Sequence, residues 1–374
     1  MKQIIISISF VTLTISNSVF AQKQTTSTLK SAYKNDFFIG AALSLSQIYG
    51  DDQSSVDVVK NQFSSIVAEN CMKSMYLQPK EGQFFFGDAD KFVAFGEKYK
   101  MFTIGHTLIW HSQLPTWFFL DDKGKDVSPE VLKQRMKSHI QTVVSRYKGK
   151  VKGWDVVNEA IMEDGSYRKS KFYEILGEDF IPLAFQYAQE ADPNAELYYN
   201  DYNEWYPGKI ATVVKMVKNI KSKGIRIDGV GMQAHVGMDG PAMAEYENAI
   251  VKYAESGVKV NITELDISAL PSPKGQSGAN IADTYAYNKA INPYVNGLPR
   301  DVEEKWENRY ADFFSLFLKH KDKIRRVTLW GVTDSQSWKN DFPVKGRTDY
   351  PLFFDRNCKA KPVVEKMIKL AETK

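Results

Sequence analysis

The most constraining feature of this sequence is a regular alternation, from Phe37 onward, of short apolar segments with longer segments of helical periodicity. The apolar segments predict eight strands, over residues 37–43, 65–70, 102–108, 153–159, 196–200, 229–234, 259–264 and 326–331. Eight strands that alternate with helices predict right-handed βα units that close into a single (β/α)8 TIM barrel, a fold of the α/β class. An open doubly wound sheet is the competing arrangement, but no Gly-rich phosphate loop follows the first strand.

Helices are predicted in the intervals between the strands. The clearest one runs over residues 128–147, with Ser128 at the N-cap position, Pro129 at the first helical position and Glu130 in the first turn. The same periodicity predicts further helices over residues 173–191, 209–223, 241–255 and 302–320. The longest irregular stretch, residues 268–299, is rich in Pro, Gly, Ser and Asn, and loops of this length are commonly functional.

The first 21 residues have the layout of a cleavable secretory signal. One Lys precedes an apolar run over residues 4–13, and Val19-Phe20-Ala21 stands before Gln22. A membrane anchor is the alternative, but Ser, Thr and Asn interrupt a run that is shorter than the roughly 20 apolar residues of a span. We therefore expect cleavage near Ala21, a secreted, periplasmic or surface-exposed product, and one domain over residues 22–374.

Composition restricts the partners of the chain. A hydrophobic content of 43% and an aromatic content of 13% allow a large core. The net charge is +4 and the basic residues are scattered among acidic ones, so neither nucleic acid nor a membrane surface is indicated. Cys71 and Cys358 are too few for a disulfide framework, although one bridge is possible in an oxidising compartment.

Two of the predicted strands end on a glutamate. Asn158 and Glu159 end a strand that carries Trp and two Val, and Glu264 ends a β-branched run two residues before Asp266. The carboxyl ends of the strands form the active face of an α/β barrel. A desolvated carboxylic acid there can protonate a departing group near neutral pH, and two such glutamates suggest glycoside chemistry. The alternative is a pair of strand-end carboxylates with Lys or Arg partners.

The other predicted strand ends carry polar and aromatic side chains, which suit sugar hydroxyls and sugar ring faces. In chain order these candidates are Glu69, Asn70, Lys73, His106, Trp110, His111, Gln113, Tyr202, Asn203, Gln233, His235, Trp330 and Trp338. Each kind of residue has an ordinary alternative. The charged residues could form local ion pairs, the histidines could be structural, and the tryptophans could fill the core.

The stretches Trp154-Asp155-Val156-Val157-Asn158-Glu159-Ala160 and Thr263-Glu264-Leu265-Asp266 resemble the acid/base and nucleophile signatures of glycoside hydrolase family 10, the endo-β-1,4-xylanases. The resemblance extends from about residue 29 to about residue 368, with several separate motifs in the expected order. It implies a catalytic barrel that hydrolyses xylan and xylo-oligosaccharides with retention, with Glu159 as acid/base and Glu264 as nucleophile. It implies no cofactor and no metal.

The resemblance also implies roles for the other candidates. Glu69, Asn70 and Lys73 would hold the sugar two places before the cleaved bond. The sugars before that bond would also contact His106, Trp110 and Gln113, with His111 left structural. Tyr202 would contact the leaving-group side, and Asn203 is a weaker candidate there.

Around the reacting carbon, the resemblance implies that Asn158 binds the 2-hydroxyl and that Gln233 steadies the two glutamates. His235 would contact Glu264, with the supporting Asp266 behind it. Trp330 and Trp338 would wall the pocket near C5 of the sugar, where crowding disfavours a hydroxymethyl group. The long stretch 268–299 is expected to border the leaving-group side.

Three rival functions remain open on the sequence. A β-1,4-glucanase of the same barrel superfamily would use the same two glutamates. In a barrel isomerase, His106, His235, Glu264 and Asp266 could hold a metal. A barrel that only binds glycans is the third alternative. We expect a monomer.

Overall fold

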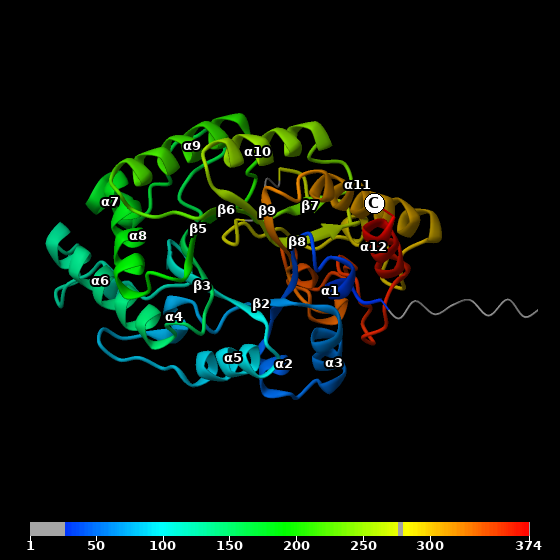
Figure 1. The fold of residues 1–374 in the computed structure, drawn as a ribbon, viewed down its shortest axis with the longest axis horizontal. Coiled ribbons are helices and arrows are strands. Elements are labelled where there is room, and N and C mark those ends of the chain that lie inside the picture. The colour runs from blue at the N-terminus through cyan, green and yellow to red at the C-terminus, as the bar shows by residue number, and fades with distance from the viewer. Residues whose placement is uncertain (1–26, 276–279, 374) are drawn as a thin grey trace, which may run out of the picture.

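The structure is a computed structural model and describes residues 27–275 and 280–373. Its centre is a barrel of parallel strands surrounded by helices (Figure 1). The strands are β1 (Phe38–Leu43), β2 (Ser65–Ala68), β3 (Phe102–Trp110), β4 (Gly153–Asn158), β5 (Glu196–Asp201), β6 (Gly229–Met232), β7 (His235–Gly237), β8 (Lys259–Ser268) and β9 (Ile324–Leu329).

The barrel closes through two pairings between strands that are not consecutive. β1 pairs with β9 in the register Phe38 to Arg326, and β6 pairs with β8 in the register Met232 to Ile262. The short β7 lies beside the carboxyl-terminal part of β8. The strands β1 to β6, β8 and β9 therefore form the closed ring, which confirms the predicted (β/α)8 TIM barrel.

Helices cover the outside of this ring (Figure 1). The longer ones are α3 (Gln53–Gln62), α5 (Gly87–Lys98), α6 (Pro129–Arg146), α8 (Phe180–Ala191), α9 (Pro207–Ser222), α10 (Met243–Glu255), α11 (Arg300–Lys319) and α12 (Pro362–Glu372). The short ones are α1 (Leu29–Ala32), α2 (Leu45–Tyr49), α4 (Ser74–Leu77) and α7 (Lys171–Leu176). The predicted N-cap of α6 is confirmed, because the Ser128 side chain accepts a hydrogen bond from the backbone N–H of Val131.

One predicted helix is wrong in part. Residues 173–191 form α7 and α8 rather than one helix, because the chain breaks at Gly177, whose φ is +62°. Glycine adopts this conformation without a steric penalty. The two cysteines are free. No helix within residues 27–275 and 280–373 combines the length and apolarity of a membrane span, and the predicted signal lies outside the described residues.

Inside the barrel, a buried charge network links β3, β4 and β9. Asp155 lies 2.9 Å from Nδ1 of His106 and 3.4 Å from the guanidinium of Arg326, and all three side chains are buried. The Arg326 guanidinium also lies over the ring of Tyr198. A buried charge is tolerated when it is paired and hydrogen-bonded. This network therefore fixes His106 below the active face.

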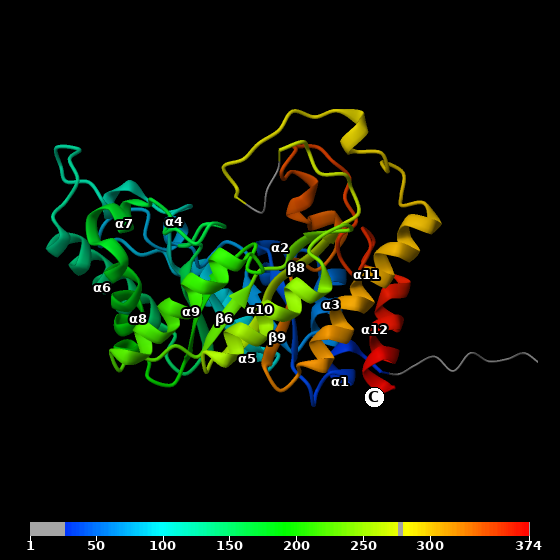
Figure 2. The ribbon, with the colours of Figure 1, turned by 90° about the horizontal axis from the view of Figure 1, so that it is seen from above.

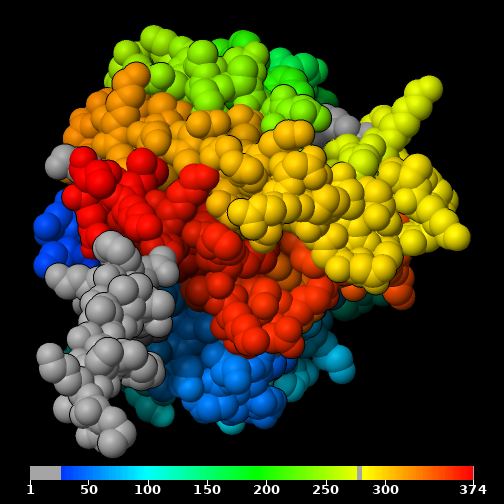
Figure 3. All heavy atoms as spheres, turned by 90° about the vertical axis from the view of Figure 1, so that its right-hand side faces the viewer, coloured from blue at the N-terminus to red at the C-terminus, as the bar shows by residue number. Residues whose placement is uncertain are grey.

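The segments that follow β8 and β9 rise together on one side of the barrel (yellow and orange in Figure 2). The backbone N–H of Tyr285 donates to the carbonyl of Pro343, and the N–H of Thr348 donates to Asn292. Below them, α11 and α12 pack against each other, orange and red in Figure 3. The long stretch after β8 is thus held against the last strand-end loop.

Gly105 in β3 lies under the ring of Trp154 on the helix-facing side of β4. A Cβ atom at Gly105 would lie 2.1 Å from Cε3 of Trp154, and Trp154 is fully buried near Tyr147, the C-cap residue of α6. Only a residue without a side chain fits there.

We predict that Gly105→Ala lowers the free energy of unfolding by about 1–3 kcal/mol, because the added methyl overpacks a closed contact. Urea-induced unfolding of the two proteins measures the difference. Gly87→Ala is the matched control, since a Cβ there meets nothing within 4 Å. Equal stability of the Gly105→Ala variant and the parent would contradict the prediction.

Candidate active site

Glu159 and Glu264 come from strands that are separated in the barrel by β5 and β6, and they share one cavity. Glu159 directly follows β4, Glu264 lies in β8, and each is only 5% exposed. The cavity has a volume of about 210 Å³. It is lined by Glu69, Asn70, Lys73, His106, Trp110, Gln113, Asn158, Glu159, Gln233, His235, Glu264, Ile281, Trp330 and Trp338. The structure therefore brings together all the predicted site residues except His111, Tyr202, Asn203 and Asp266.

Glu159 is an acid in a largely desolvated position. Burial raises the pKa of its carboxyl, and hydrogen bonds from Gln233 and Trp110 moderate the effect. Nε1 of Trp110 donates to Oε2 at 2.8 Å, and Nε2 of Gln233 donates to Oε1 at 3.0 Å. The backbone of Glu159 is in the left-handed region, with φ +57°, a conformation that is costly for a residue other than glycine. This carboxyl is suited to carry a proton.

Glu264 is equally buried, but its pKa moves the other way. Burial alone would raise the pKa of this carboxyl, yet a hydrogen bond from His235 and the nearby His106 hold it below its ordinary value. Nε2 of His235 lies 3.1 Å from Oε2, and the Asn200 amide donates to Oε1 at 2.8 Å. The surroundings of Glu264 therefore favour its ionised form, whereas those of Glu159 favour its protonated form.

Asn200, at the end of β5, connects the two glutamates. Its amide donates to Oδ1 of Asn158 at 2.9 Å as well as to Glu264, and its own oxygen accepts from Thr263 at 2.7 Å. Asn158 in turn donates to Glu159 at 3.2 Å. Asn200 is not among the site residues predicted from the sequence. Its position at a predicted strand end, like that of Asn158, was the available signal.

His235 stands between two carboxylates. Its Nδ1 lies 2.9 Å from Asp266, and Trp338 donates to the same Asp266 oxygen at 2.7 Å. Burial would lower the pKa of His235, but Asp266 and Glu264 together raise it. A protonated His235 donates to both carboxylates, so Asp266 acts on the cavity through His235 rather than by lining it.

The opposite end of the cavity is built around Lys73. Its ammonium donates to Asn70 at 2.9 Å and to Gln113 at 2.7 Å, and it lies over the Trp110 ring. Burial lowers the pKa of Lys73 and raises that of the neighbouring Glu69. This group presents fixed donors and acceptors, which suits the hydroxyls of a sugar.

Three predicted residues lie elsewhere. Tyr202 is buried, and its hydroxyl accepts a hydrogen bond at 2.7 Å from Arg168, outside this cavity. His111 does not line the cavity either, and burial lowers the pKa of its ring to about 3. Asn203 lines a neighbouring cavity. Ile281, from the long stretch after β8, does reach the site, and no pattern in the sequence indicated it.

The four residues of the predicted alternative metal site are occupied by hydrogen bonds with one another and with Asp155. Within the described part of the chain, no group of three or more His, Cys, Asp or Glu side chains is arranged to hold a metal ion. The geometry thus gives no support to the metal-site alternative.

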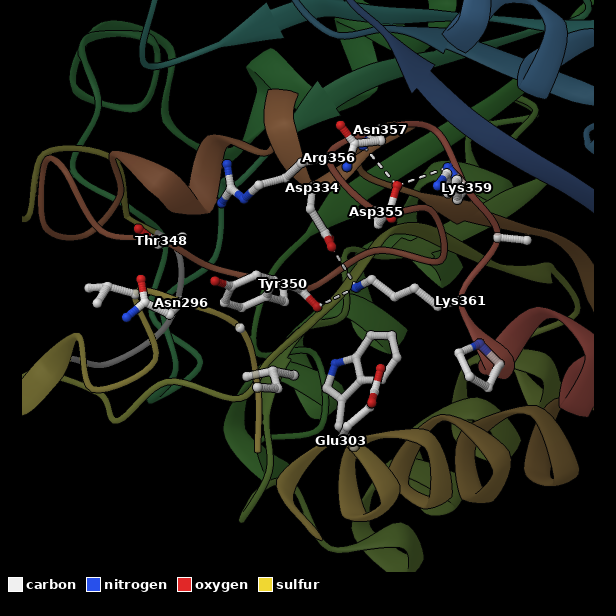
Figure 4. Close-up of a pocket in the computed structure, with 16 residues that line it drawn as sticks. Asn296, Glu303, Asp334, Thr348, Tyr350, Asp355, Arg356, Asn357, Lys359 and Lys361 are labelled. Carbon is white, nitrogen blue, oxygen red and sulfur yellow. Dashed lines mark hydrogen bonds and ion pairs between the residues drawn. The ribbon is translucent and has the colours of Figure 1, made fainter. Parts of the chain in front are cut away.

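A larger cavity of about 670 Å³ lies outside the barrel, between the last strand-end loop and the start of α11 and α12 (Figure 4). Its most deeply buried charges, those of Asp334 and Lys361, are paired with each other. Lys361 lies 2.6 Å from Asp334 and donates to the Tyr350 carbonyl, while Asp355 accepts from two backbone N–H groups. Because its buried ion pair is already made, this cavity is a weaker candidate for chemistry than the one that holds Glu159 and Glu264.

Comparison with known proteins agrees with this geometry. The profile of Glycosyl hydrolase family 10 matches residues 28–370. The chain belongs to glycoside hydrolase family 10. It is 50% identical to endo-1,4-beta-xylanase A of Xylanibacter ruminicola, over 95% of this chain and 96% of that protein. It is 41% identical to the endo-1,4-beta-xylanase of Geobacillus stearothermophilus, over 91% and 98%.

A solved structure described as a novel GH10 endoxylanase from a sugarcane soil metagenome is also similar. It has 47% sequence identity and a TM-score of 0.87, and the match covers 92% of this chain and 99% of that one. The family 10 barrel of the present protein thus has close relatives in both sequence and structure.

We predict that Trp110→Phe raises the pKa of Glu159, because it removes an N–H donor that stabilises the charged carboxylate. Carbon-13 NMR of labelled glutamate carboxyls, followed over pH, measures the change. Trp117→Phe is the control, since the Trp117 indole donates to the Gln78 carbonyl instead. A Glu159 pKa that is unchanged or lower in Trp110→Phe would contradict this account.

Proposed function

We propose that the protein is an endo-1,4-β-xylanase that cleaves xylan with retention of anomeric configuration. One observation carries the proposal: two buried glutamates line one cavity, and their surroundings shift their pKa values in opposite directions. Two carboxyls with separated pKa values are the signature of an acid and a nucleophile that act together. The names of the relatives supply the substrate, xylan.

In the first step, Glu264 attacks the anomeric carbon of the sugar while Glu159 gives its proton to the departing oxygen. The bond from the anomeric carbon to that oxygen breaks, and a covalent glycosyl-enzyme forms on Glu264. In the second step, Glu159 removes a proton from water, and the hydroxide oxygen displaces Glu264. Two inversions give retention, for which a carboxyl separation of about 5–5.5 Å is required.

The neighbouring side chains assist at the reacting ring. We assign Asn158 to the 2-hydroxyl, where a hydrogen bond strengthens as positive charge develops on the ring. Glu69, Asn70, Lys73 and Gln113 bind the sugars before the scissile bond. Trp330 and Trp338 wall the cavity, and Trp330 lies edge-on to the His106 ring at 5.4 Å between centroids. Walls of this size favour xylose over a sugar with a hydroxymethyl group.

The β-1,4-glucanase alternative is not favoured, because the relatives are named as xylanases. Export after cleavage near Ala21 stays a prediction, as does action as a monomer.

We predict that Glu264→Ala abolishes xylan hydrolysis with the fold retained, because no other group can capture the anomeric carbon. Added azide should restore turnover of an activated aryl xylobioside and give the glycosyl azide of inverted configuration. Reducing-sugar release, circular dichroism and NMR of the azide product provide the measurements. Near-normal turnover of xylan by the variant would refute the role of Glu264.

We predict that Glu159→Ala loses about 10²–10⁴-fold in kcat/KM on xylan, the usual contribution of a general acid. The loss should be much smaller on an aryl xylobioside whose leaving group needs no proton. With azide, the product should keep the original configuration, because Glu264 still acts first. Equal losses on both substrates would argue against an acid role. Glu255→Ala, at the carboxyl-terminal end of α10, is the control and should match the parent.

A further inference from the structure

The carboxyl-terminal end of β5 supports the proposed active site from two sides. On the inner side of the barrel, Asn200 donates a hydrogen bond to Glu264. Successive side chains of a strand point to opposite faces, so Tyr199 and Asp201 lie on the side that faces the helices. Neither of these two residues lines the active-site cavity. Both are nevertheless buried polar groups directly beside it.

The Tyr199 hydroxyl makes one hydrogen bond as donor and one as acceptor. It donates to Oδ2 of Asp201, and its oxygen accepts from the backbone N–H of Ala160 at 3.0 Å. The same Oδ2 atom accepts from the N–H of Ile161 at 3.4 Å. Ala160 and Ile161 directly follow Glu159. Two side chains of β5 therefore bind the two backbone donors that come after the proposed acid.

These contacts fall at a strained point of the chain. The backbone of Glu159 has a φ of +57°, and such a conformation persists only where the surrounding contacts over-determine it. The N–H of Glu159 donates to the Asn200 carbonyl at 2.9 Å, and its carbonyl accepts from Nε of Arg168 at 2.8 Å. Tyr199 and Asp201 hold the residues that follow. Together these contacts fix the direction in which the Glu159 side chain leaves the backbone.

Asp201 orients the Tyr199 hydroxyl. Oδ1 of Asp201 accepts from the ammonium of Lys209 in α9 at 2.9 Å, and from the N–H of Tyr202 at 2.9 Å. Both members of this ion pair are buried, and a buried charge is tolerated when it is paired and hydrogen-bonded. Because the Tyr199 proton is directed at this anchored carboxylate, the lone pairs of its oxygen are left to accept the N–H of Ala160.

We propose that Tyr199 is a positioning residue for proton transfer, which holds the N–H of Ala160 and thereby aims the Glu159 carboxyl at the departing oxygen. This inference rests on the proposed xylanase function and deepens it by naming a residue that acts on the acid without touching the substrate. A small misplacement of a reacting group lowers the rate of the step in which that group acts. Attack by Glu264, which lies in β8, does not depend on this contact.

The test compares two substrates that differ in their need for an acid. The leaving group of linear xylohexaose requires a proton, whereas that of dinitrophenyl xylobioside does not. In both cases kcat/KM reports the first step, in which Glu159 acts as acid. For Tyr199→Phe we expect kcat/KM to fall about tenfold on xylohexaose, the effect of roughly one hydrogen bond, and to stay within about twofold on the aryl substrate.

Two further variants separate positioning from folding. Tyr33→Phe removes another buried hydroxyl, which donates to the Met367 carbonyl at 2.8 Å, and should keep the parent ratio of the two kcat/KM values. Replacement of Tyr199 by 4-aminophenylalanine keeps a donor for Asp201, but its nitrogen is a poor acceptor for Ala160. This variant should show the same selective loss as Tyr199→Phe, and it decides the matter if Tyr199→Phe does not fold.

A second readout does not depend on activity. The indole N–H of Trp110 donates to Glu159, so its proton resonance in NMR reports where the carboxyl lies. We expect this resonance to move upfield in both Tyr199 variants, because the hydrogen bond loosens when the carboxyl is no longer held in place. It should not move in Tyr33→Phe.

An unchanged ratio of the two kcat/KM values in the Tyr199 variants would overturn the proposal. Losses in proportion on both substrates would overturn it too, because they would indicate a purely structural role. Failure of the parent protein to cleave xylohexaose would instead contradict the xylanase function. In that case the Trp110 resonance still decides the inference, since an unshifted signal in the Tyr199 variants would overturn it.

Discussion

The site depends on one constraint: two carboxyls are removed from water at the same end of the barrel, and the proposed mechanism needs them to differ in charge. Burial opposes ionisation of both Glu159 and Glu264. The pKa of Glu264 is lowered nevertheless, because His235 and Asn200 donate hydrogen bonds to its carboxylate. Asp266, which lies behind His235, stabilises the cationic form of that histidine. The difference between the proposed acid and the proposed nucleophile therefore comes from their neighbours and not from how deeply they are buried.

The fold was predictable because its signals are local and repeated. An apolar segment of the sequence predicts each barrel strand, and Ser128 followed by Pro129 predicts the N-cap of α6. The incorrect prediction of one helix across Gly177 has a local cause as well. The amphipathic pattern continues across this glycine, and the pattern alone does not show that the backbone turns there. The left-handed φ of Gly177 and the short 3-10 turn Gly177–Asp179 separate α7 from α8.

Most of the residues that form the site could be predicted from the sequence, but the hydrogen bonds between them could not. Strand ends converge in a barrel, so polar residues at predicted strand ends were expected to meet, and most of them line one cavity. The left-handed backbone at Glu159, Gln113 and Asn203 carries no signal in the sequence, because these residue types do not require it. The bridging role of Asn200 depends on the register between β4 and β5, which residue spacing does not fix.

Charge alternates from the active site into the neighbouring cavity. Glu264, His235, Asp266 and Lys339 follow one another as anion, cation, anion and cation, each within 3.7 Å of the next. Because each member stabilises the charge of its neighbour, Lys339 supports an ionised Asp266, and Asp266 supports a protonated His235 beside Glu264. A change in the charge of Lys339 is therefore transmitted electrostatically to Glu264 through Asp266 and His235.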